Sequence, residues 1–231
     1  MRVCVDYRKL NTVKNTDAFP LTFTDSLLDA VAGHDMYSFL DGFDGYNQVR
    51  IPPEDKDKTS FITEWGVFVA VVTMFGLQTA PTTFQRTITE IFGDFIPMFM
   101  QVFLDDFAVS RTQADHLSHL RLCLERCHTS RLTLDPAKCA FGVTSGALLG
   151  HIVIKDGIIV DPNKIKAIVE VKTPNNAKAL SHFFGKIRWQ SCMICYSADF
   201  ATPLHDVVHC IAYKWMITDD KAYKALKVML T

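Results

Sequence analysis

The sequence lacks a long hydrophobic run. Its apolar stretches are interrupted by charged residues well short of the ~20 residues that a membrane-spanning helix needs. The opening segment MRVCVDYRKL also lacks the apolar centre of a secretory signal peptide. We therefore expect an intracellular protein (cytoplasmic or nuclear) with no membrane segment.

The sequence also lacks the excess of basic residues that helps a protein to neutralise phosphates, because its formal net charge is −1. The charge is unevenly distributed. Residues 1–161 carry 14 Lys and Arg against 20 Asp and Glu, whereas residues 162–231 carry 10 against 5. Six cations of the second part are Lys164, Lys166, Lys172, Lys178, Lys186 and Arg188. They could follow a nucleic-acid backbone, but a solvated helix face explains them as well.

The sequence also lacks low-complexity segments and internal repeats, and its number of cysteines is odd. Seven cysteines without a secretory signal indicate reduced thiols. Cys192 and Cys195 form a lone CxxC, which is a weak motif because zinc needs four convergent ligands.

One predicted helix carries a stripe with zinc-ligand chemistry, formed by His116, His119, Cys123 and Cys127. The same helix carries Leu117, Leu120 and Leu124, which we interpret as its core face. The histidines and cysteines are then ordinary neighbours of an apolar stripe, and zinc is the less favoured reading.

The sequence has 231 residues, of which 48% are hydrophobic and 21% charged, enough for one large domain or two small ones. Strands and helices alternate without a repeated βαβ period, which favours an α+β sheet with helices on one face. Helices are expected at about residues 24–31, 81–92 and 114–130, and strands at about 59–72, beside 105–106, and near 132, 140–141 and 148–159. Asp161 and Pro162 mark the boundary to a helical second part, as N-cap and first helical residue.

Two adjacent aspartates, Asp105 and Asp106, interrupt the apolar segment Met100–Val109 (MQVFLDDFAV). Neighbouring residues of a strand point to opposite faces, so both carboxylates reach one site only if the chain turns beside them. The pattern predicts either a hairpin tip that holds a cation or a solvated surface turn.

A third acid, Asp41, ends the apolar run in Tyr37–Val49 (YSFLDGFDGYNQV) and is followed by Gly42, Gly45 and Tyr46. Two Mg²⁺ ions need several carboxylate oxygens and open positions for phosphates. Asp41, Asp105 and Asp106 could supply them, which points to phosphoryl transfer.

Several segments resemble, in order and spacing, the reverse transcriptases of gypsy-type LTR retrotransposons, especially plant members. They are Arg2–Asn11 (RVCVDYRKLN), Ser38–Ile51 (SFLDGFDGYNQVRI), Phe75–Arg86 (FGLQTAPTTFQR), Val102–Val109 (VFLDDFAV), Leu134–Val143 (LDPAKCAFGV), Leu148–Val153 (LLGHIV), and Val160–Ile187, which resembles the segment that leads out of the palm. The resemblance covers essentially the whole chain. It implies a right-hand polymerase palm of α+β class, an antiparallel sheet backed by helices. Residues 1–160 would form partial fingers and palm, and residues 161–231 a mainly helical thumb and the start of the connection, truncated before any RNase H.

The resemblance also implies roles for individual residues. Asp41, Asp105 and Asp106 match the catalytic acids that hold two Mg²⁺ ions, with Mn²⁺ as a possible substitute. The nucleotide-binding positions are Arg2, Tyr46, Phe75 and Gly76. The turn that cradles the primer is Leu149, Gly150 and His151. Tyr46 has the alternative of a core aromatic, and His151 that of a surface turn residue.

The implied activity is RNA-directed DNA polymerisation by two-metal nucleotidyl transfer. Its partners would be an RNA or DNA primer-template, deoxynucleoside triphosphates, and a second copy of the chain or the protease, RNase H and integrase of a polyprotein.

The sequence departs from the family pattern at several positions, including Gln78 and Thr79. Met1 replaces a tryptophan, and Thr73 and Met74 replace a Met-Pro pair. The family also has more fingers sequence upstream. These departures keep an alternative open, namely a catalytically inactive remnant that retains the palm fold and at most binds nucleic acid or protein weakly.

Overall fold

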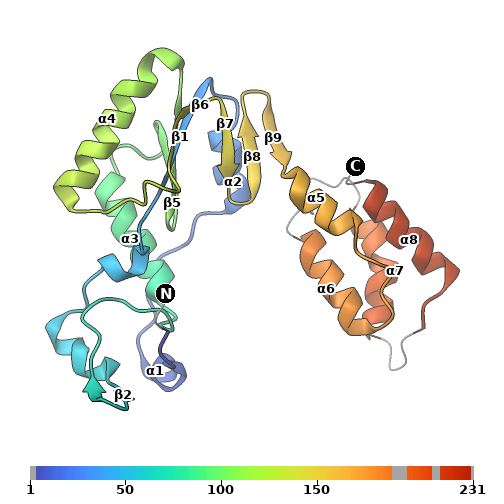
Figure 1. Cartoon of the computed structure of the whole chain (residues 1–231), viewed down its shortest axis with the longest axis horizontal. Coiled ribbons are helices and arrows are strands. Elements are labelled where there is room, and N and C mark those ends of the chain that lie inside the picture. Colours follow the sequence, from blue (N-terminus) through green and yellow to red (C-terminus); the bar gives the residue numbers. More distant parts are fainter. Residues whose placement is uncertain (1–3, 189–196, 210–213, 230–231) are drawn as a thin grey trace. The chain divides into compact units, whose positions relative to one another are not determined.

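The computed structural model describes residues 4–188, 197–209 and 214–229. The chain divides into two compact units, Met1–Ile158 and Ile159–Thr231. The first unit is a mixture of helices and antiparallel sheets, and the second is helical (Figure 1). The α+β class predicted from the sequence is therefore confirmed.

A four-stranded sheet forms the centre of the first unit. Its strand order is β4 (Met100–Phe103), β5 (Asp106–Arg111), β1 (Met36–Asp41) and β6 (Ala140–Val143), with antiparallel neighbours. The pairing of β1 with β5 places Asp41 opposite Asp106. The last residue of β1 and the first residue of β5, which are far apart in the sequence, therefore lie side by side at one end of the sheet.

One face of this sheet is covered by α3 (Ala80–Phe92) and α4 (Gln113–Ser130). Alternate strand residues such as Leu40, Phe107 and Val109 turn toward these helices and are buried there. This face holds the larger core of the unit, and it fits the expectation of a sheet backed by helices.

The opposite face is also covered, which differs from the expectation of helices on one face. It packs against α2 (Thr24–Val31) and against a second sheet of β7 (Ser145–Leu148), β8 (His151–Ile154) and β9 (Gly157–Val160). The reason is that Tyr37, Phe39 and Ala108 make this face apolar as well, so it needs a cover of its own.

The remaining elements of the first unit are short. They are α1 (Arg8–Val13), the 3₁₀ turns η1 (Gly45–Gln48) and η2 (Pro53–Thr59), and the hairpin of β2 (Phe61–Thr63) and β3 (Gly66–Phe68). The strands expected at about residues 59–72 are present as this hairpin, which occupies part of that range. The strand expected near Leu132 is absent from the described residues, where Leu134 forms only an isolated bridge with Gly42.

The core face of α4 was assigned wrongly from the sequence. Leu117 and Leu124 are exposed, whereas His116, Cys123 and Cys127 are buried beside Leu120. Cysteine behaves as a small apolar side chain, and these positions follow the helical period. Burial raises the pKa of Cys123 to about 12 and that of Cys127 to about 11, so both thiols stay protonated. The CxxC motif of Cys192 and Cys195 lies outside the described residues.

The second unit consists of α5 (Pro162–Val169), α6 (Ala177–Arg188), α7 (Ser197–His209) and α8 (Ile217–Val228) around one apolar core. Asp161 caps α5 as predicted, because its Oδ1 accepts a hydrogen bond from the Asn163 amide at 2.9 Å. Among the six cations named in the sequence of this unit, Lys166 pairs with Glu170, and Lys186 donates to the Ala167 carbonyl.

No helix in the described part of the chain combines the length and the apolar character that crossing a bilayer requires.

A buried polar contact between α4 and the sheet generates a stability prediction. The Ser38 hydroxyl lies 2.8 Å from His116 Nε2 and accepts from the Gly142 amide at 3.0 Å. Ser38→Ala leaves both groups without this partner, so the free energy of unfolding should fall by about 1–3 kcal/mol in urea denaturation. The matched control is Ser118→Ala, whose hydroxyl is exposed and should matter by less than ~0.5 kcal/mol. Equal stability of both variants would contradict the assignment.

Candidate functional site at the end of the central sheet

The Asp105-Asp106 segment forms a tight hairpin, and a turn at this place is common to both interpretations of the sequence. Phe103 pairs with Asp106, so Leu104 and Asp105 alone make the loop, and Leu104 has a positive φ of 52°. Buried Gln85 from α3 supports this turn. Its Oε1 accepts from the Leu104 amide at 2.7 Å, and its Nε2 donates to the Val102 carbonyl at 3.2 Å. Gln85 therefore fixes the backbone of the turn through these two hydrogen bonds.

Asp41 and Asp106 project from the same face of the sheet, because directly opposed residues of an antiparallel pair share a face. This is the face away from α3 and α4. Burial raises the pKa of the Asp106 carboxyl, the negative charge of Asp41 raises it further, and Lys138 offsets part of this shift. The negative charges of Asp41 and Asp106 thus act on each other, and Lys138 compensates them only in part.

Lys138 supplies a cation to this pair. Its Nζ donates to Asp41 Oδ1 at 2.9 Å and lies 3.7 Å from Asp135 Oδ2. The loop that carries Lys138 is fixed to β1, because the Asp135 amide donates to the Asp41 carbonyl at 2.8 Å.

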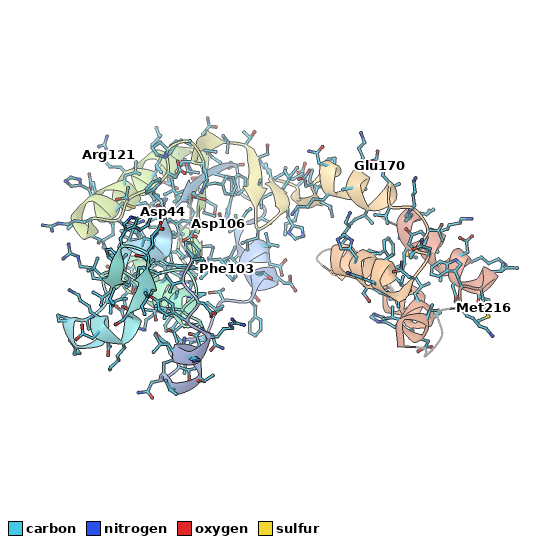
Figure 2. All side chains as sticks on the ribbon, turned by 60° about the horizontal axis from the view of Figure 1, so that its bottom comes forward. Asp44, Phe103, Asp106, Arg121, Glu170 and Met216 are labelled. Atoms are coloured by element: carbon cyan, nitrogen blue, oxygen red, sulfur yellow. The ribbon has the colours of Figure 1, made fainter. Side chains whose placement is uncertain are left out.

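Asp105 is placed by a close approach to η1. A Cβ on Gly45 would lie 1.8 Å from Asp105 Oδ1 and 3.1 Å from the Phe84 ring, so the absence of a side chain at Gly45 allows this position of the Asp105 carboxylate. The Asp105 carbonyl also accepts from the Gly42 amide at 2.8 Å. Figure 2 shows Asp44, Phe103 and Asp106 in the same part of the first unit. The end of β1 and the hairpin turn therefore form one structural unit.

Among the residues that the structure describes, no three His, Cys, Asp or Glu side chains converge as a metal-holding group. The facing pair Asp41 and Asp106 nevertheless fits one hard cation. Its donors are all oxygens, which suit Mg²⁺ or Mn²⁺, and its excess negative charge is the condition that a cation relieves.

The predicted nucleotide-binding residues Tyr46 and Phe75 lie together, with ring centroids 5.2 Å apart. Tyr46 also meets Phe84 edge-on at 5.8 Å and is partly buried against the core. The ring of Tyr46 therefore lies at the rim of the core. This position is compatible with both interpretations of Tyr46, a nucleotide-binding residue and a core aromatic. Arg2, the fourth predicted residue of this group, lies outside the described residues.

Gly76 requires its glycine. It has φ 111°, and a Cβ would lie 2.2 Å from the Val5 carbonyl oxygen. The loop around it is clamped by Asn11, whose Nδ2 donates to the Gly76 carbonyl at 2.8 Å and whose Oδ1 accepts from the Gln78 amide at 3.0 Å.

Thr73 and Met74, where the sequence departs from the family pattern, keep an ordered corner. The Thr73 amide donates to the Val49 carbonyl at 2.8 Å, and the Met74 carbonyl accepts from the Leu77 amide at 3.4 Å. The corner therefore closes without a proline.

Leu149 and Gly150 form a turn at the predicted place, and His151 is the first residue of β8. Leu149 and Gly150 have φ values of 47° and 79°, as a two-residue loop between β7 and β8 requires. His151 is 4% exposed, and its Nδ1 lies 3.2 Å from the Leu149 carbonyl oxygen. The alternative of a surface turn residue is therefore wrong for His151, while Leu149 and Gly150 form the outer turn.

A cavity of about 610 Å³ lies apart from these acids. It is lined by Leu10, Val13, Lys14, Asn15, Val49, Arg50, Ile51, Pro52, Asp55, Lys58, Thr59, Thr73, Leu77, Thr79 and Thr83. None of the predicted site residues lines it, so cavity size alone would direct attention away from the acids. The acids, in contrast, combine opposed carboxylates with a perturbed pKa, which is typical of functional sites.

Three supporting residues escaped the sequence analysis: Gln85, Asn11 and Lys138. Each acts on a segment far away in the sequence, and its residue type is common on protein surfaces. The only available signal was that all three lie inside the segments that resemble the family. That signal alone does not predict which residues they contact.

The Gly45 contact predicts a positional effect on Asp105. Gly45→Ala should force the Asp105 carboxylate to another rotamer and lower the nucleotidyl transfer implied by the resemblance about a hundred-fold. Gly42→Ala is the matched control, since its added Cβ would meet its nearest atom at an ordinary 3.6 Å. Comparable activities of the two alanine variants in primer extension would disprove the close packing.

Comparison with solved structures gives the same fold. A foamy viral protease-reverse transcriptase in complex with double-stranded DNA matches with a TM-score of 0.91 and 18% identity, over 99% of this chain and 41% of that one. The foamy viral protein in complex with an RNA/DNA hybrid matches with a TM-score of 0.86 and 18% identity, over 97% of this chain and 31% of that one.

Similar sequences are found in transposon polyproteins. The retrovirus-related Pol polyprotein from transposon 297 of Drosophila melanogaster is 31% identical over 99% of this chain. The transposon Tf2-3 polyprotein of Schizosaccharomyces pombe is 26% identical over 100% of it. The chain spans only 22% and 17% of the length of these two relatives.

The family model described as reverse transcriptase (RNA-dependent DNA polymerase) matches residues 1–153, which contain the three acids, the Tyr46–Phe75 pair and the turn before β8. The chain therefore belongs to the reverse transcriptase family.

Proposed function

We propose that this chain is the polymerase part of a retrotransposon polyprotein and extends a primer with deoxynucleotides by two-metal nucleotidyl transfer. The observation that carries the proposal is the register of β1 with β5, which opposes Asp41 to Asp106 and sets Asp105 in the adjoining turn. Both strands lie within the residues that match the family.

Asp41, Asp105 and Asp106 would hold the cations, with Mg²⁺ as the natural choice for oxygen donors. When bound, the cations would supply Lewis-acid activation of the primer hydroxyl and charge neutralisation of the leaving pyrophosphate. The chain's own contribution is to fix the carboxylates. The β1–β5 register does so for Asp41 and Asp106, and the Gln85-supported turn and Gly45 do so for Asp105.

Tyr46, Phe75 and Gly76 would form the pocket of the incoming nucleotide, with Arg2 gripping its phosphates. The ring contact of Tyr46 with Phe75 and the clamp from Asn11 to Gly76 support this assignment, because they give the pocket a rigid wall. Tyr46 would lie under the sugar and exclude a ribose 2′-hydroxyl.

Leu149 and Gly150 would hold the primer backbone, since a two-residue turn with a glycine allows close approach, and the buried His151 would support this turn through its contact with the Leu149 carbonyl. The bound DNA and RNA/DNA hybrid named for the structural neighbours support an RNA or DNA primer-template as partner. Residues 1–160 would then be partial fingers and palm, and residues 161–231 thumb. A homodimer or the other polyprotein domains could complete the enzyme, which would work inside the cell, where deoxynucleotides are available.

A direct test is primer extension on an RNA template with Mg²⁺. Asp105→Asn should abolish extension while the protein stays folded by circular dichroism, because it removes a carboxylate from the hairpin. Asp94→Asn is the matched control, since the Asp94 side chain is 79% exposed and outside the site, and it should leave extension unchanged. No extension by folded wild-type protein would favour the inactive remnant. Extension that survives Asp105→Asn would refute the role of the acids.

Tyr46 generates a second prediction. Tyr46→Ala should raise the ratio of ribonucleotide to deoxynucleotide incorporation at least about ten-fold, because it removes the ring that would block a 2′-hydroxyl. Tyr46→Phe keeps the ring and should preserve discrimination. The ratio is measured within one protein, so a general loss of activity does not affect it. An unchanged ratio in Tyr46→Ala would return Tyr46 to a purely structural role.

A further inference from the structure

Lys138 stands between two carboxylates at the end of β1. Its Nζ lies 2.9 Å from Asp41 Oδ1 and 3.7 Å from Asp135 Oδ2. The side chains of Asp41 and Asp135 are 19% and 20% exposed, while that of Lys138 is 55% exposed. Lys138 is therefore the most exposed member of the set, and both of its partners are more buried.

The backbone fixes this arrangement. The Asp135 amide donates to the Asp41 carbonyl at 2.8 Å, and the Asp135 carbonyl accepts from the Lys138 and Cys139 amides at 3.1 Å. The Asp41 amide in turn donates to Cys139 Sγ at 3.4 Å. The loop of Lys138 is thus joined to the end of β1 by backbone contacts, so the lysine is directed at Asp41 by the fold.

The contact has a consequence for any cation at the acids. Asp41 is in register with Asp106, and its Oδ1 is the oxygen that Lys138 already engages. A divalent cation that takes Asp41 must therefore displace the ammonium group. Asp135 offers that group an alternative partner within a small rotation of the lysine side chain, because its Oδ2 is already 3.7 Å away.

We propose that Lys138 is an exchangeable counter-ion that holds Asp41 when no divalent cation is bound and moves to Asp135 when a cation takes its place. The inference rests on the proposed function, which requires the cation. Lys138 is a positioning residue in this scheme, and it sets the cation concentration at which the site fills.

Direct Mn²⁺ binding, measured by electron paramagnetic resonance of the whole chain, tests the exchange without relying on activity. Lys138→Gln removes both the competitor and a repelling charge, so Mn²⁺ should bind roughly three- to ten-fold more tightly, as for a partly exposed ion pair. Asp135→Asn keeps the hydrogen bond that Oδ1 accepts from the Ala137 amide, but it weakens the alternative partner. Mn²⁺ should then bind about two- to five-fold more weakly.

The double variant separates exchange from a general charge effect. With Lys138→Gln present, Asp135→Asn should have almost no further effect, because no ammonium group remains to be moved. Lys155→Gln is the matched control: Lys155 pairs with Asp35 at 2.7 Å away from the acids, and its loss should leave Mn²⁺ binding unchanged. All variants are compared by circular dichroism to establish that they are folded.

The outcomes distinguish this inference from the proposed function. Mn²⁺ binding that Asp106→Asn abolishes but Lys138→Gln leaves unchanged or weakens overturns the exchange alone. Absence of carboxylate-dependent binding in both the wild type and Lys138→Gln overturns the cation site and the exchange together. Binding that is tighter in Lys138→Gln and insensitive to Asp135→Asn in that background supports the exchange.

Discussion

The site depends on one constraint, the antiparallel register that places Asp41 opposite Asp106. Burial raises the pKa of the Asp106 carboxyl, and the negative charge of Asp41 on the neighbouring strand raises it further. The fold tolerates this arrangement because the apolar residues of the same strands are buried on both faces of the sheet. Stability elsewhere in the sheet thus supports an unfavourable arrangement at its end, as functional sites often require.

Uncharged residues support the backbone around the candidate site, in addition to the ion pair of Lys138 with Asp41. Gln85 ties the hairpin turn to α3, Gly45 leaves room for the Asp105 carboxylate, and Asn11 holds the loop of Gly76. None of these residues carries charge, and each acts through a backbone contact or through the absence of a side chain. Contacts of this kind fix the backbone that carries the site residues, which favours precise positioning of reacting groups.

Much of the first unit could be predicted from local patterns. The helix over residues 24–31 has the predicted limits, and the Asp105 turn is a hairpin as proposed. The face of α4 was wrong, because leucines were preferred over Cys123 and Cys127 as core residues. The sheet was expected to have helices on one face, whereas the side chains of Tyr37 and Phe39 require α2 on the other. Both errors concern which surface a residue meets, and that depends on packing partners outside the local window.

The sequence by itself determined the family of this protein, through the order and spacing of its segments, and the chemical types available at the site. The match over residues 1–153 confirmed that family. Only the tertiary structure decided that Asp41 faces Asp106, that Lys138 reaches Asp41 across 97 positions of sequence, and that His151 is buried. The physical reason is that local propensities define turns and helices, whereas strand register and long-range ion pairs arise only when distant segments pack together.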